Sequence, residues 1–106
     1  MILKGVAASG GVAKGAARII ISHKDLKRFQ KGDVLVTYIT DPSMVVMMNR
    51  ASAIICDIGS ITSHPSIVSR ELGIPCVVNV KKATKILKDG MKLKVDGNKG
   101  KIYILR

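Results

Sequence analysis

A histidine directly precedes a proline in the segment Thr62-Ser63-His64-Pro65, which holds the side chains best suited to chemistry. Because a residue before proline is kept out of the helical region, we expect an extended His64, at or just before the start of a helix that begins at Pro65. A neutral imidazole has one nitrogen lone pair free, so it can accept a phosphoryl group and pass it on. The pattern therefore predicts a nucleophilic histidine at a helix N-terminus.

The residues around this histidine predict an anion site. The first amides of a helix have no partner within it, so we expect the amides of Ser66 and Ile67 to be available to an anion, helped by the helix dipole. The hydroxyls of Thr62 and Ser63 are expected to converge near the imidazole. Gly59, in the preceding loop, would let the backbone approach closely.

The glycine-rich start of the chain, Ala8 to Gly15, invites comparison with a phosphate-binding loop. Its glycines have the right gap, but Ala16 and Ala17 follow where a lysine and a hydroxyl residue are needed. We therefore expect a tight structural loop rather than a nucleotide site.

Three further kinds of chemistry are not supported. A hydrolase in which His64 activates Ser63 or Ser66 lacks a third group to orient the imidazole. Cys56 and Cys76 lie inside apolar runs without redox or zinc spacing, so we expect buried, unreactive thiols. No set of His, Cys, Asp and Glu has metal-ligand spacing, so no metal site is expected.

Short apolar runs alternate with turn signals along the chain. The expected strands and helices are, in turn, strands 16–21, 34–39, 53–56, 76–78, 92–95 and 101–105, and helices 25–30, 42–50, 65–72 and 83–87. Asp41 before Pro42 is typical of a helix start, and Gly73 of a helix end. Strands that alternate with helices favour parallel pairing, and the final hairpin favours a second, antiparallel layer. The expected fold class is mixed α/β.

The composition fits one compact domain, residues 1–106. The 106 residues are 47% hydrophobic and 24% charged, which is too apolar for a disordered chain. No apolar run approaches the roughly 20 residues of a membrane span, and the N-terminus does not resemble a signal peptide. We therefore expect a cytoplasmic protein with no membrane partner.

The charge is strongly basic and unevenly placed. Lysine and arginine number 18 against 7 acidic residues, and residues 81–106 carry nine basic residues against Asp89 and Asp96. A basic surface attracts polyanions, so an acidic partner that docks on Lys81 to Lys101 and a nucleic acid are both alternatives. Aromatic residues are only 3% of the chain, and no stacking platform is present, so specific nucleic-acid binding is not expected.

The segment from Gly59 to Val78 resembles the phosphohistidine signature of phosphoenolpyruvate-utilising enzymes. Their mobile, or swivelling, domain occurs in phosphoenolpyruvate synthase, pyruvate phosphate dikinase and enzyme I of the sugar phosphotransferase system. The likeness covers nearly the whole chain, because further matches lie at 8–15, 32–36, 40–42, 83–84, 87–90 and 95–100. Ser60, Pro65 and Asn79 depart from the pattern, which commonly has Gly, a small residue and Gly there. Asparagine tolerates a left-handed backbone better than most residues.

The resemblance implies a three-layer β/β/α swivelling domain with a parallel central sheet and a smaller antiparallel layer. It implies that His64 is the phosphoryl acceptor and that Thr62 and Ser63 orient or hydrogen-bond the phosphoryl group. Gly59, Ser66 and Ile67 would support that group as described above. Arg70 would pair with Glu71 or with an anion.

The resemblance also implies partners. The domain would swing between a nucleotide-binding, ATP-grasp-like partner and a barrel that binds phosphoenolpyruvate or pyruvate. ATP and Mg would belong to those partners, and this chain would bind no cofactor. Since 106 residues leave no room for either partner, we expect a phosphotransferase component with an incomplete active site. A module that kept the fold but lost phosphoryl transfer, and docks on other proteins, remains the alternative.

Overall fold

Strands and short helices alternate along the computed structural model, which describes residues 1–105 apart from the side chain of His23. Arg106, the last of the basic C-terminal residues, lies outside the described part. The strands are β1 (Ile2–Lys4), β2 (Val6–Ser9), β3 (Val12–Ile20), β4 (Val34–Thr37), β5 (Ala53–Cys56), β6 (Cys76–Val78), β7 (Lys92–Asp96) and β8 (Lys101–Ile104). The helices are the 3₁₀ turns η1 (His23–Arg28) and η2 (Pro42–Met44) and the α-helices α1 (Val45–Met48), α2 (His64–Leu72) and α3 (Ala83–Ile86).

The strands hydrogen-bond in the order β1-β8-β7-β3-β4-β5-β6-β2. Neighbours from β3 to β6 are parallel, and the remaining pairs are antiparallel. Strand β3 belongs to two sheets, because Val12–Ala16 pairs with β7 and Ala17–Ile20 pairs with β4. In the same way β1 pairs with β8, and β2, which follows after Gly5, pairs with β6. The two sheets are therefore joined at both sides.

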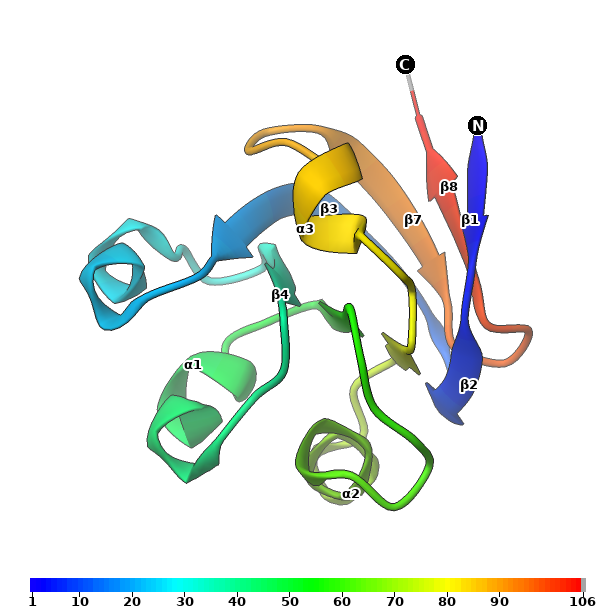
Figure 1. Ribbon diagram of the computed structural model, residues 1–106, viewed down its shortest axis with the longest axis horizontal. Coiled ribbons are helices and arrows are strands. Elements are labelled where there is room, and N and C mark those ends of the chain that lie inside the picture. The colour runs from blue at the N-terminus through cyan, green and yellow to red at the C-terminus, as the bar shows by residue number, and fades with distance from the viewer. Residues whose placement is uncertain (106) are drawn as a thin grey trace.

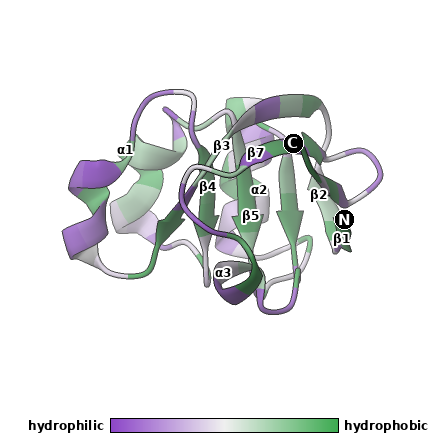
Figure 2. Ribbon diagram, turned by 90° about the horizontal axis from the view of Figure 1, so that it is seen from above, coloured by the Kyte–Doolittle hydropathy of each residue, from purple (hydrophilic) through white to green (hydrophobic). Residues whose placement is uncertain are grey.

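The parallel sheet is the middle of three layers. Helices α1 and α2 lie on one side of it, and the antiparallel strands β7, β8 and β1 lie on the other, as Figure 1 shows. The central strands β4 and β5 are buried along their whole length, and their β-branched, apolar residues suit a strand covered on both faces. Figure 2 shows the hydrophobic character of these strands. The expected three-layer β/β/α fold is confirmed.

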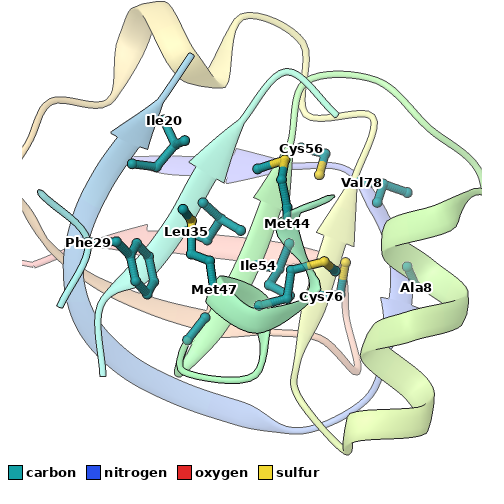
Figure 3. Close-up of a cluster of buried hydrophobic side chains, with 12 residues drawn as sticks. Ala8, Ile20, Phe29, Leu35, Met44, Met47, Ile54, Cys56, Cys76 and Val78 are labelled. Carbon is teal, nitrogen blue, oxygen red and sulfur yellow. The ribbon is translucent and has the colours of Figure 1, made fainter. Parts of the chain in front are cut away.

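A hydrophobic core fills each space between layers. The core between the parallel sheet and the helices is shown in Figure 3, and its fully buried members include Leu35, Met48 and Ile54. The core between the two sheets includes Val36, Ile55, Val77, Leu93 and Ile102, with Ala83 and Leu87 of the α3 region packed against it. Burial of each such large side chain contributes about 1.5–3 kcal/mol. The two cores hold the parallel strands rigid on both faces.

The glycine-rich start is where the fold differs most from expectation. We expected a tight loop from Ala8 to Gly15, but these residues end β2 and begin β3, and only Gly10 and Gly11 form the turn. Gly15 allows close packing of backbone, because a Cβ there would lie 2.6 Å from the Gly32 carbonyl oxygen. The small residues therefore serve strand packing and not a loop.

The helices before and after β4 are shorter than expected. The expected helix 25–30 is the 3₁₀ turn η1, and the expected helix 42–50 is η2 followed by the single turn α1. The predicted helix start is confirmed, since the Asp41 carboxylate accepts a hydrogen bond from the Ser43 amide at 2.8 Å. The predicted end of α2 is also confirmed, with Gly73 in a left-handed conformation at φ 71°. Within residues 1–105, no helix is long and apolar enough to cross a membrane.

Candidate functional site

The candidate site lies at the carboxyl ends of β4 and β5. Thr40 follows β4, and the loop of residues 57–63 leads from β5 to His64 at the start of α2. In a parallel sheet, the carboxyl ends of neighbouring strands meet at one edge, where ligands usually bind. This edge therefore brings together residues that are far apart in the sequence.

One hydrogen bond fixes the imidazole. The Thr40 hydroxyl lies 2.7 Å from Nδ1 of His64, which is partly buried, while Thr40 is only 4% exposed. If Nδ1 carries the ring proton and donates it to the hydroxyl oxygen, Nε2 keeps a free lone pair. If the hydroxyl donates instead, Nε2 carries the proton. Thr40 therefore holds the imidazole through Nδ1 in either case, and sequence reasoning did not assign this threonine to the site.

The helix begins one residue earlier than expected, and this changes which amides are available. Ser63, with φ −77° and ψ 163°, is the extended N-cap, and His64 is the first helical residue. The amides of Ser66 and Ile67 both donate to the Ser63 carbonyl, at 3.0 and 3.1 Å. The expectation that these two amides lack intrahelical partners was therefore wrong. Pro65 has no N–H, so the first turn offers fewer free donors than we expected.

The serine and threonine hydroxyls organise the loop in front of the helix. The hydroxyls of Ser63 and Ser66 donate to the Ser60 carbonyl, at 2.7 and 2.6 Å. The Thr62 hydroxyl lies 3.1 Å from that of Ser60. These contacts stay within the loop and the first turn of α2, whereas the hydroxyl on the imidazole is that of Thr40. The convergence of Thr62 and Ser63 on the ring is thus not the arrangement of this structure.

Gly59 is needed for the loop to close. Its φ of +130° is unfavourable for any residue with a side chain. An added Cβ would also lie 2.9 Å from the Ser63 Oγ and 3.3 Å from the Val78 Cβ. The close neighbours of this glycine are thus the side chains of Ser63 and Val78.

Arg70 connects the loop before α2 to strand β2 by hydrogen bonds. Its guanidinium donates to the carbonyl oxygens of Ala8 in β2 and Ile61 in the loop, at 2.8 and 2.7 Å. We expected this side chain to pair with Glu71 or an anion, and the structure instead engages it with backbone carbonyls. The arginine therefore fixes the position of the loop relative to the sheet.

The two thiols are buried, with Cys56 at the end of β5 below this edge and Cys76 at the start of β6, toward the opposite edge of the sheet. Burial, reinforced by the nearby Cys76 thiol, raises the pKa of Cys56 well above its usual value. Burial raises the pKa of Cys76 to about 11. Both thiols therefore stay protonated near neutral pH, as a buried and inert cysteine should. Among the described residues, no three His, Cys, Asp or Glu side chains gather closely enough to hold a metal ion.

Comparison with known proteins adds independent information about this site. Residues 29–100 match the family model described as the PEP-utilising enzyme mobile domain. The chain is 52% identical over 103 residues to the probable phosphoenolpyruvate synthase of Archaeoglobus fulgidus and to the phosphoenolpyruvate synthase of Pyrococcus furiosus. These matches cover 97% of the chain but only 14% and 13% of the two relatives. The chain thus corresponds to a small part of each.

Solved structures support the same architecture. A solution structure of Enzyme I matches 74% of this chain and 33% of its own, with a TM-score of 0.64 and 28% identity. The holo-form of aconitase X from Thermococcus kodakaraensis matches all of this chain and 99% of its own, with a TM-score of 0.72. That second match is 23% identical, so it shows a common fold alone.

Proposed function

The chain belongs to the family of the PEP-utilising enzyme mobile domain, and from this membership we propose that it is a phosphohistidine carrier with His64 as the acceptor. The observation that carries the proposal is the hydrogen bond between Thr40 Oγ1 and Nδ1 of His64. When the ring proton lies on Nδ1 and is donated to this hydroxyl, Nε2 has a lone pair available for a phosphoryl group.

The proposed transfer requires no separate base. The lone pair of Nε2 attacks the phosphorus of a phosphoryl donor, and a P–N bond forms as the P–O bond to the leaving group breaks. The departing oxygen takes the electron pair of that bond. The ring becomes a cation that still carries its proton on Nδ1, facing Thr40 Oγ1. Attack by an acceptor oxygen on the same phosphorus reverses the sequence and restores the neutral imidazole.

The remaining site residues would support the bound phosphoryl group. Thr62 and Ser63 would turn their hydroxyls from the loop toward its oxygens, because both lie within the turn that precedes His64. Gly59 and Arg70 would keep that turn in place. Ser66 and Ile67 would contribute as part of the first helical turn, whose positive end favours an anion.

The exchange needs partners, since the chain spans about 13–14% of the length of the relatives compared above. We propose a nucleotide-binding partner and a phosphoenolpyruvate- or pyruvate-binding partner, consistent with the phosphoenolpyruvate synthases to which the chain is similar. ATP and Mg would be held by those partners. This chain would carry only the phosphoryl group between them.

The acceptor can be tested by intact-mass analysis at alkaline pH. The chain would be incubated with phosphoenolpyruvate, or with ATP and Mg, in the presence of a full-length phosphoenolpyruvate synthase. We expect one added phosphoryl group that survives base and is lost in acid, because a phosphoramidate hydrolyses in acid. His64→Asn should abolish it, while Thr62→Ala and Ser63→Ala should weaken it.

Two results would count against this function. An acid-stable label that persists in His64→Asn would assign the acceptor to a serine or threonine of the same turn. No label at all, together with a stable complex that His64→Asn still forms, would favour a docking module that has lost transfer.

A further inference from the structure

A hollow of about 540 Å³ opens at the same edge of the parallel sheet as the histidine. Its apolar wall is formed by Ile21, Tyr38 and Ile58, which follow β3, β4 and β5 in turn. These side chains are 73%, 56% and 37% exposed. Apolar side chains this exposed, gathered around one hollow, are typical of a surface that another molecule covers.

The rim of the hollow carries unbalanced positive charge. Lys81, Lys82 and Lys85 line it and are exposed, and every ion pair found within residues 1–105 uses an arginine. Asp57, the carboxylate that the structure describes in this lining, is buried and already engaged. Its two oxygens accept from the amide and hydroxyl of Thr84, at 2.9 and 2.6 Å. These donors are uncharged, so three lysines of the described lining face a single carboxylate, and the rim is positive on balance.

The backbone under the rim is held in an uncommon conformation. Asn79 and Lys82 have φ of 56° and 63°, and they are the non-glycine residues with positive φ in the described chain. Both line the hollow. A left-handed backbone is costly for a lysine, and such positions cluster where a surface contacts a ligand or partner.

The hollow shares its supporting loops with the histidine. Tyr38 lies two residues before Thr40, whose hydroxyl holds the imidazole, and Ile58 lies in the loop that leads to His64. A molecule large enough to bring a phosphoryl donor to the imidazole would therefore also cover this hollow. That continuity favours a protein surface over a free small molecule.

We propose that this hollow docks an acidic segment of the partner that exchanges the phosphoryl group, an inference that rests on the proposed function. An apolar side chain of the segment lies against Tyr38 and Ile58. Carboxylates on either side of it face Lys81, Lys82 and Lys85. Such charge complementarity fixes the register of docking and speeds the encounter, while the apolar contact holds the complex.

The probe for this docking is the peptide acetyl-Asp-Glu-Phe-Glu-Asp-amide, titrated into the ¹⁵N-labelled chain and followed by NMR. We expect the largest shifts at the amides of Tyr38, Ile58 and residues 79–85. Combined reversal of Lys81, Lys82 and Lys85 to Glu should weaken binding about tenfold or more, because rim charges each supply part of the attraction. Tyr38→Ser, which leaves the lysines intact, should weaken it as well.

The matched control reverses Lys14, Lys92 and Lys99 to Glu, three lysines of the antiparallel layer and its hairpin, with the same change in net charge. This control should bind within about twofold of the unchanged chain, because its charges lie away from the hollow. Equal weakening in both variants would overturn the proposal, as would equally strong shifts at the same amides with inorganic phosphate or oligouridylate.

The docking surface and the carrier function can fail separately. His64→Asn should bind the peptide as the unchanged chain does, because the imidazole does not line the hollow. If the peptide binds there and His64 is never phosphorylated, the docking stands and the carrier function fails. If labelling is normal in the Lys81, Lys82 and Lys85 variant over a range of partner concentrations, the docking proposal fails and the carrier function stands.

Discussion

At the scale of single residues, the main feature of the site is the hydrogen-bonded pair of Thr40 and His64. The threonine is almost fully buried and its hydroxyl is 2.7 Å from Nδ1, so the imidazole cannot turn without losing this bond. The bond fixes the orientation of the ring, and Nε2 has a free lone pair when Nδ1 is the donor. A hydroxyl that merely positions the ring would therefore affect the rate without taking part in the bond changes.

Replacing Thr40 tests this positioning role. Thr40→Val keeps the shape but removes the hydroxyl, so it should slow phosphorylation of His64 by about tenfold, the effect of losing a hydrogen bond worth about 1.4 kcal/mol. Thr40→Ser should restore most of the rate. The ¹⁵N shifts of the imidazole nitrogens report the tautomer directly, and they should change in Thr40→Val but not in Thr40→Ser. An unchanged tautomer with normal labelling would refute the role.

The histidine could be predicted from sequence, but its partner could not. His64 is flagged by the proline and hydroxyl residues beside it, which are local signals. Thr40 is 24 positions away, and its place in the site depends on β4 and β5 being parallel neighbours. The usable signal was its position just after a buried apolar run, because the ends of parallel strands meet at one edge.

At the scale of elements, the loop between β5 and α2 decides whether the site forms. It is fixed by Gly59 at one end, by hydroxyl bonds to the Ser60 carbonyl, and by Arg70 from the helix. The loop is exposed over most of its length, so burial does little to hold it in one conformation. These contacts hold it instead. Its rigidity is therefore a matter of backbone geometry and hydrogen bonds.

Gly59→Ala should destabilise the fold by about 2–4 kcal/mol, because the positive φ and the collision with Ser63 and Val78 both oppose a side chain. The control is Gly32→Ala, where φ is +93° and nothing lies within 4 Å of the added Cβ. That variant should cost only about 1–2 kcal/mol for the backbone strain. Urea unfolding measures both values. Equal losses would mean that the loop yields to the added methyl group.

Element prediction succeeded in the buried centre and failed at the glycine-rich start. The β-branched runs at β4, β5 and β6 indicate buried strands because few other structures suit them. Glycine and alanine in 8–15 suit a turn equally well, and only the close approach of neighbouring backbones shows that they form strands. The availability of the Ser66 and Ile67 amides was misjudged for a similar reason, since the cap lies one residue earlier than Pro65 suggests.

At the scale of the whole molecule, a cluster of Asp25, Arg28 and Asp89 connects η1 with the segment before β7. Asp89 also accepts from the Ile19 amide of β3 at 2.7 Å. Hydrogen bonds from the Ile21 and Ser22 amides lower the pKa of Asp25. Burial opposes the same effect at Asp89, but the Ile19 amide and the Arg28 guanidinium outweigh it and lower its pKa. The cluster thus links η1, the end of β3 and the segment before β7.

This cluster predicts how stability depends on pH. A carboxylate whose pKa is lower in the folded than in the unfolded protein stabilises the fold, and this contribution is complete above about pH 4. The contribution is lost as the pH falls through the pKa of the folded state. Asp89→Asn should therefore reduce stability at neutral pH by about 1 kcal/mol or less, given its solvent exposure, and flatten the acid decline. Thermal unfolding between neutral pH and pH 2 measures this, with Glu71→Gln, an exposed carboxylate outside the cluster, as the control. A variant with the same acid decline as the unchanged chain would contradict it.

The three-layer order was predictable only through family resemblance. Periodicity gave a parallel layer and a final hairpin, but it gave no reason for β3 to pair with β7 in its first half and with β4 in its second. That division depends on where the partners lie, because the residues of both halves are compatible with either sheet.

The strands that connect the two sheets also affect how the molecule unfolds. Strand β3 hydrogen-bonds into both sheets, and the consecutive strands β1 and β2 belong to one sheet each, so the two sheets are linked covalently at both sides. We therefore expect the two sheets to unfold together in one cooperative transition. A partner bound at the histidine edge should consequently protect the antiparallel layer from unfolding as well, although the partner does not contact that layer.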